Sequence, residues 1–149
     1  MNTPCTLWPS PLSPETVAAG ARLLAEPQVG REALYWLAGL PEEGGRTTLM
    51  RKRGDEAAHS LLPSPYNARS RVNEYGGGAY TVTPAGEAWF VNGDDQALCR
   101  VRGETIERVF QADDLALGDL AWDNVHGRVL AVGEALAGTP RQKIGRAHV

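Results

Sequence analysis

Short apolar segments that alternate with glycine- and proline-containing turns are the feature that most limits how this chain can fold. The 149 residues contain 17 glycines and 10 prolines, a combined share above the background of about 12%. The apolar segments are too short for long helices and show the spacing of β-strands. The sequence therefore predicts an all-β protein and excludes a long-helix architecture.

The predicted strands fall into three groups. The first group has strands over 23–29, 33–40 and 47–53, with a hairpin loop at 41–46. The second group is a meander whose four strands cover 79–83, 87–92, 96–101 and 105–110. The third group has two strands, 117–123 and 128–134, on either side of a turn at 124–127. Each group is therefore expected to form its own antiparallel sheet.

An internal repeat relates the three groups. The inner strands at 34–37, 88–91 and 129–132 carry similar apolar sequences, each ahead of a glycine or asparagine. Repeats of about 40 to 50 residues with several strands each are typical of β-propeller blades. We therefore predict an incomplete β-propeller of about two and a half four-stranded blades, over 22–65, 79–111 and 117–142. Because a propeller closes with about four to eight blades, we expect the chain to be part of a larger protein.

An open propeller leaves surfaces that further blades would cover. Since the third group ends after two predicted strands, we expect 128–134 to present an unpaired edge. We also expect large apolar side chains to be only half covered, namely Tyr35, Trp36, Leu49, Trp89, Phe90, Leu98, Trp122 and Leu130.

The two ends of the chain are set apart from this β-rich part. Residues 1–21 are expected to be an extension with a short helix over 12–21, because Ser13 suits an N-cap and Pro14 the first helical position. The residues from Ile144 to Val149 match the translation of a common sequencing adapter. We therefore expect 143–149 to be an artefact that carries no fold information.

Charge and composition exclude several kinds of partner. The formal net charge is −3 and the basic residues are scattered, so no nucleic-acid partner is expected. The start of the chain has no basic and apolar leader, and no segment approaches the roughly 18 apolar residues of a membrane span. We therefore expect a cytoplasmic protein without a membrane partner, and its distant cysteines Cys5 and Cys99 to be reduced thiols.

No catalytic, metal or cofactor motif is found. None of the five serines lies in a G-x-S-x-G turn, and adjacency of His59 and Ser60 does not make a catalytic pair. The acidic pairs at 94–95 and 113–114 lack the regular spacing of calcium ligands. The glycines at 76–78 are not followed by the Lys-Ser/Thr of a phosphate loop. We therefore predict no catalytic residue, no metal and no cofactor in this chain.

The candidate site is the polar segment 67–78. Its candidate residues are Arg69, Arg71, Glu74 and Tyr75, which combine two guanidinium groups, a carboxylate and an aromatic ring next to three glycines. One interpretation is a crossover between blades in which Arg69 or Arg71 pairs with Glu74. The other is a substrate-binding or domain-interface role.

The same segment carries a family resemblance. The run N-x-R-S-R-V-x-E-Y-G-G-G-A-Y at 67–80, with A-L-Y-W-L at 33–37 and W-F-V-N at 89–92, resembles prolyl oligopeptidase-family serine peptidases. The bacterial dipeptidyl aminopeptidase and acylaminoacyl-peptidase type is most similar. The resemblance implies an N-terminal β-propeller over a C-terminal α/β-hydrolase domain that holds the whole Ser-Asp-His triad. It also implies a peptide substrate, which the propeller selects by size and can hold by one terminus.

Two functions follow as expectations. In the first, the chain is the N-terminal propeller fragment of a cytoplasmic serine peptidase, itself inactive, whose partners in the parent are a peptide substrate and the hydrolase domain. In the second, it is a β-propeller binding scaffold without any hydrolase.

Overall fold

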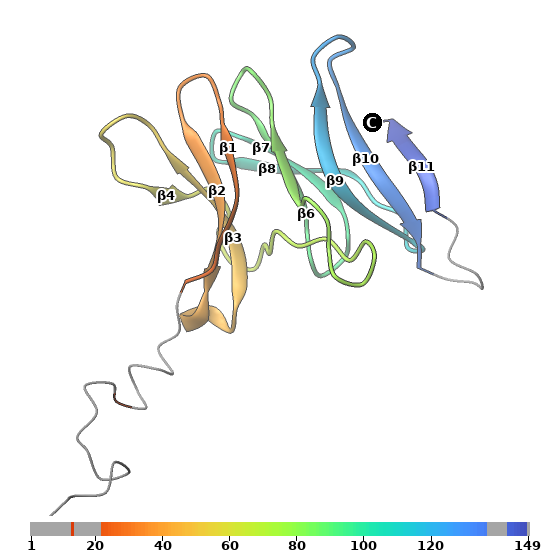
Figure 1. The fold of residues 1–149 in the computed structure, drawn as a ribbon, viewed down its shortest axis with the longest axis horizontal. Helices are drawn as coiled ribbons and strands as arrows, with labels where there is room; N and C mark the ends of the chain where they lie inside the picture. Colours follow the sequence, from red (N-terminus) through yellow and green to blue (C-terminus); the bar gives the residue numbers. More distant parts are fainter. Residues whose placement is uncertain (1–12, 14–21, 137–142, 149) are drawn as a thin grey trace, which may run out of the picture.

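The computed structural model describes Ser13, residues 22–136 and the backbone of 143–148, which form three antiparallel sheets (Figure 1). The first sheet has the order β1 (Leu24–Val29), β2 (Leu34–Leu40), β3 (Arg46–Lys52) and β4 (His59–Ser60). The second has the order β5 (Tyr80–Val82), β6 (Ala88–Val91), β7 (Leu98–Arg102) and β8 (Thr105–Phe110). The third has the order β11 (Lys143–His148), β10 (Arg128–Ala135) and β9 (Leu115–Asp123).

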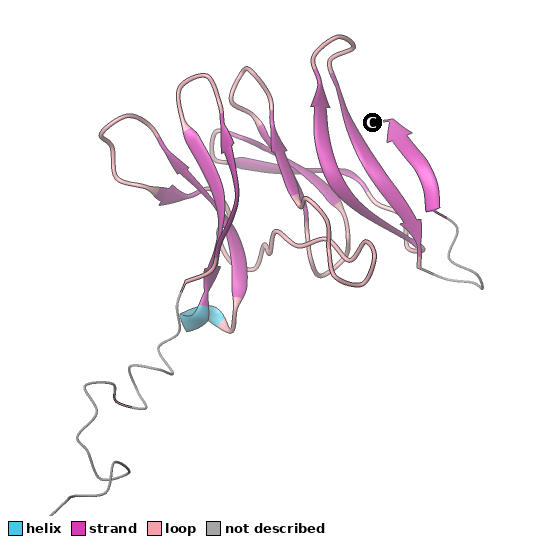
Figure 2. Ribbon diagram, viewed as in Figure 1, coloured by secondary structure: helices cyan, strands magenta, loops and turns pink. Residues whose placement is uncertain are grey.

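The all-β prediction is confirmed. Helical structure within the described residues is limited to the 3-10 turn Pro41–Glu43 between β2 and β3 (Figure 2). The three repeated segments lie in β2, β6 and β10, which are flanked by a strand on each side. None of the three sheets formed by the described residues closes into a barrel. The helix predicted over 12–21 lies outside the described residues, apart from Ser13.

The expectation of an unpaired edge at 128–134 is wrong. β10 pairs along its free side with β11, from Leu130 opposite His148 to Glu134 opposite Lys143. Residues 143–148, which were expected to belong to an artefact, supply the backbone groups that complete this ladder.

The apolar core lies in two layers between neighbouring sheets. One cluster joins the first and second sheets around Tyr35, Leu49 and Phe90. A second cluster joins the second and third sheets around Leu98 and Val129. All five of these side chains are at most 2% exposed. The expectation of half coverage is therefore wrong for Tyr35, Leu49, Phe90 and Leu98, because two neighbouring sheets suffice to bury them.

Some of the predicted residues are only partly covered. Trp36, Trp122 and Leu130 keep intermediate exposure, whereas Trp89 is buried. In β2 the side chains of Tyr35 and Leu37 face the core, so alternation directs Leu34 and Trp36 to the opposite face of the first sheet.

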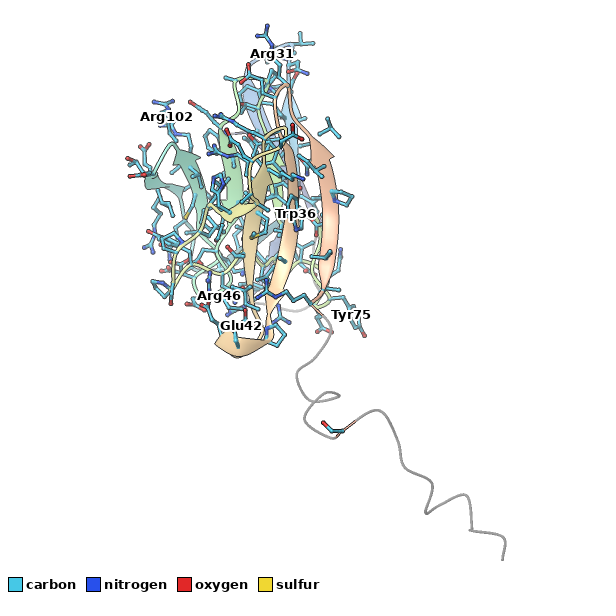
Figure 3. All side chains as sticks on the ribbon, turned by 90° about the vertical axis from the view of Figure 1, so that its left-hand side faces the viewer. Arg31, Trp36, Glu42, Arg46, Tyr75 and Arg102 are labelled. Atoms are coloured by element: carbon cyan, nitrogen blue, oxygen red, sulfur yellow. The ribbon has the colours of Figure 1, made fainter. Side chains whose placement is uncertain are left out.

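The strand connections lie at two ends of the molecule. Figure 3 shows Arg31 and Arg102 at one end and Glu42, Arg46 and Tyr75 at the other. The long connection from β4 to β5 runs along the end that carries Tyr75, below the second sheet in Figure 1. Within the described residues, no helix has the length and apolar character needed to cross a membrane.

We predict that the outer face of the first sheet makes the isolated chain self-associate and bind hydrophobic dyes. Leu24 and Leu34 are 65% and 42% exposed there, and no other described segment covers them. Leu24→Lys with Leu34→Lys should lower dye fluorescence severalfold and shift gel filtration toward the monomer. A wild-type chain that is monomeric, binds no dye and unfolds cooperatively above about 50 °C would contradict this expectation.

Candidate functional site

The segment 67–78 gathers all four predicted site residues at one end of the molecule. Arg69, Arg71, Glu74 and Tyr75 line a hollow of about 210 Å³, together with Asn67, Ser70, Gly93 and Asp94. All four predicted side chains are exposed, and Tyr75 is 95% exposed. The residues that the sequence singled out are therefore neighbours in space, and their roles stay predictions.

Turn residues of the second sheet fasten the first half of this segment. The Asn92 Oδ1 accepts a hydrogen bond from the Asn67 amide at 3.1 Å. The Gln96 Oε1 accepts the Arg71 amide at 2.8 Å, and its Nε2 donates to the Arg69 carbonyl at 3.2 Å. Gln96 is only 3% exposed. One buried amide side chain therefore holds the backbone of both arginines.

The third sheet fastens the middle of the segment. The Glu134 Oε2 on β10 accepts the Asn73 amide at 2.6 Å. The buried Ser70 hydroxyl donates to the Leu117 carbonyl on β9 at 2.7 Å. A Cβ at Gly118 would lie 2.5 Å from the Ser70 Oγ, so only glycine allows this approach.

Two acidic residues at equivalent positions fasten the last part. Glu26 on β1 and Asp119 on β9 both lie at strand irregularities and have positive φ angles of 52° and 49°. The Asp119 Oδ1 accepts the Gly78 amide at 2.8 Å, and the Glu26 Oε2 accepts the Ala79 amide at 3.1 Å. Acidic side chains from β1 and β9 thus bind the adjacent Gly78 and Ala79 amides just before β5.

Burial raises the pKa values of two residues at these contacts, Glu26 and Tyr80. Partial burial raises the pKa of Glu26 above its ordinary value, and the charge of Asp119 adds to the rise while the Ala79 amide opposes it. Burial also raises the pKa of Tyr80, whose hydroxyl donates to the Glu26 carbonyl. The Tyr80 phenol is therefore neutral across the physiological range and serves as a stable donor.

The predicted pairing of Arg69 or Arg71 with Glu74 is not formed. Within 22–136 neither guanidinium group makes an ion pair, and Arg71 makes one long contact of 3.4 Å with the Asp94 carbonyl. The segment is held through its backbone instead. The guanidinium groups of Arg69 and Arg71 consequently do not fix the loop.

His59 and Ser60, which were not expected to be a catalytic pair, contact different groups. The Ser60 Oγ donates to the Leu62 carbonyl at 3.0 Å, while the His59 ring lies 3.0 Å from the Arg51 guanidinium. No group of three metal-ligating side chains is found in the part of the chain that the structure describes.

Comparison with known proteins gives structural neighbours only. No protein-family model and no curated protein matches the sequence significantly. A puromycin-hydrolyzing peptidase of Mycobacterium tuberculosis matches with 33% identity and a TM-score of 0.74 over 85% of this chain. A puromycin hydrolase matches with 29% identity over 88% of this chain, with a TM-score of 0.72. Its serine-to-alanine variant complexed with PGG gives the same identity and coverage with a TM-score of 0.77.

These matches confirm the resemblance to peptidases of the prolyl oligopeptidase family. The chain covers 21% or 22% of the length of each solved protein, so it spans about one fifth of them.

We predict that Glu26→Gln keeps the hydrogen bond from the Ala79 amide and removes a pH-dependent loss of folding stability. Because the folded pKa of Glu26 lies above its unfolded value, wild-type stability should fall as pH rises from the ordinary glutamate value of about 4.5 through the raised value. The neutral amide still offers an oxygen to the Ala79 amide. At pH 7 the urea midpoint of the Glu26→Gln variant should therefore match or exceed that of the wild type. The variant's stability should also lack this part of the pH dependence.

Glu26→Ala is the matched control for the hydrogen bond itself. It leaves the buried Ala79 amide without an acceptor, which should lower the free energy of unfolding by about 1–3 kcal/mol. Equal stability of the alanine variant and the wild type would show that this hydrogen bond does not contribute to folding stability.

Proposed function

We propose that this chain, which resembles the N-terminal region of peptidases of the prolyl oligopeptidase family, is the β-propeller portion of a cytoplasmic serine peptidase that cleaves short peptides. The 33% identity and TM-score of 0.74 to a peptidase carry this proposal. The sheet topology supports it, because two successive four-stranded meanders have the strand order of propeller blades. In this view the third sheet belongs to a further blade.

The proposed role of this portion is to control access and to contact substrate. Hydrolysis needs an activated nucleophile, a base and oxyanion donors, which we assign to the rest of the parent protein. The segment 67–78 would face that catalytic portion. Its Arg69 and Arg71 guanidinium groups suit a peptide carboxylate or carbonyl, and Glu74 suits an amine. A backbone fixed by buried side chains lowers the entropic cost of such binding.

A binding scaffold without hydrolase is the alternative, and the polar hollow beside 67–78 is compatible with it. The sequence of the complete gene would decide between the peptidase and the binding scaffold. A G-x-S-x-G motif several hundred codons downstream supports the peptidase, whereas further blades alone support the scaffold.

We predict that the 149-residue chain does not hydrolyse dipeptidyl or acylaminoacyl chromogenic substrates, or puromycin. The complete protein should hydrolyse at least one of them and lose this activity after treatment with a serine-directed phosphonate. Release of chromophore or of the puromycin amine would be measured for both forms. Phosphonate-sensitive turnover by the 149-residue chain would refute the assignment of catalysis to the rest of the parent.

We predict that Arg71→Ala lowers kcat/KM of the complete protein about tenfold or more. Loss of a charged hydrogen bond to substrate costs about 1.5–3 kcal/mol, and one tenfold step is about 1.4 kcal/mol. Arg31→Ala is the control, because Arg31 is exposed at the opposite end (Figure 3). If Arg71→Ala lowers only the melting temperature and leaves the kinetics unchanged, the segment is structural.

A further inference from the structure

Tyr75 is the most exposed large apolar or aromatic side chain that the structure describes, at 95%. It lines two separate hollows, one of about 210 Å³ beside Arg71 and one of about 480 Å³ beside Leu37 and Ala79. The ring therefore stands between the hollows as a projection. A small ligand in either hollow would cover one side of the ring, whereas a protein surface would cover both sides.

The backbone around Tyr75 holds the ring outward. Asn73 and Glu74 adopt the left-handed conformation, with φ of 58° and 63°, and Gly76 follows with φ of 89°. The Asn73 amide is bound by the buried Glu134, and the Gly76 amide donates to the Val72 carbonyl at 2.9 Å. Such a turn is too well fixed for the ring to reach the core, so its exposure is built into the fold.

We infer that Tyr75 is an anchor that the catalytic portion of the parent protein covers. This inference rests on the proposed function, since the matched peptidases are about four times as long as this chain and the remainder of such a protein would supply the covering surface. Tyrosine is among the residues most enriched in the energetic centres of interfaces. Arg69 and Arg71 line the hollow of about 210 Å³ together with Tyr75. The complementary surface of the catalytic portion would be an apolar pocket for the Tyr75 ring, with carboxylate or carbonyl groups around it.

Nitration of the complete wild-type protein with tetranitromethane tests this inference without changing Tyr75. A reporter variant, Val125→Tyr, places a tyrosine in the 85%-exposed position of the β9–β10 turn. Peptide mapping should find Tyr75 protected at least tenfold relative to the reporter. Nitration of Tyr75 as fast as the reporter would overturn the inference.

Tyr75→Ala and Tyr75→Phe provide the second measurement. The alanine variant should separate the unfolding of the two portions into two transitions and speed proteolysis between them several-fold, while the phenylalanine variant should behave as wild type. Unchanged unfolding with a raised KM for peptides would overturn the anchor and assign Tyr75 to substrate. Absence of phosphonate-sensitive peptidase activity in the complete wild type would instead refute the proposed function, whatever the Tyr75 variants do.

Discussion

The backbone amides of the connection between the first and second sheets need acceptors, and this requirement governs the end of the molecule that carries the candidate site. A connection without regular strands cannot satisfy its own polar groups through a ladder. Side chains from all three sheets supply the acceptors here, among them Glu26, Asp119 and Glu134. The position of Arg69, Arg71 and Tyr75 depends on these contacts more than on any interaction of their own side chains.

The strands were predictable because their signal is local. Alternation of apolar residues and the placement of turn residues located β2, β6 and β10, and the repeat identified them as inner strands. The grouping of Arg69, Arg71, Glu74 and Tyr75 was also predictable, because they are close in the sequence. β11 was not predicted, because its residues were expected to be an artefact.

The supporting residues could not be predicted from the sequence. Glu26 and Asp119 look like ordinary surface acids within strands, and their function follows from left-handed backbone at two strand irregularities. Gln96 and Glu134 carry no motif, and only the tertiary structure brings them under Arg71 and Asn73. Tyr35 and Phe90 are buried more fully than expected, because the contacts between the first and second sheets are enough to cover both side chains.

The sequence separation of the residues joined by these acidic contacts also affects how the chain folds. The bonds from Asn73 to Glu134, from Ala79 to Glu26 and from Gly78 to Asp119 join residues 61, 53 and 41 positions apart. Contacts of such high contact order form late, because much of the chain must be ordered first. The three amides can be shielded from solvent exchange only when the first and third sheets have both assembled against the connection. Their exchange rates therefore report that assembly, and the connection is expected to become rigid late and to open early.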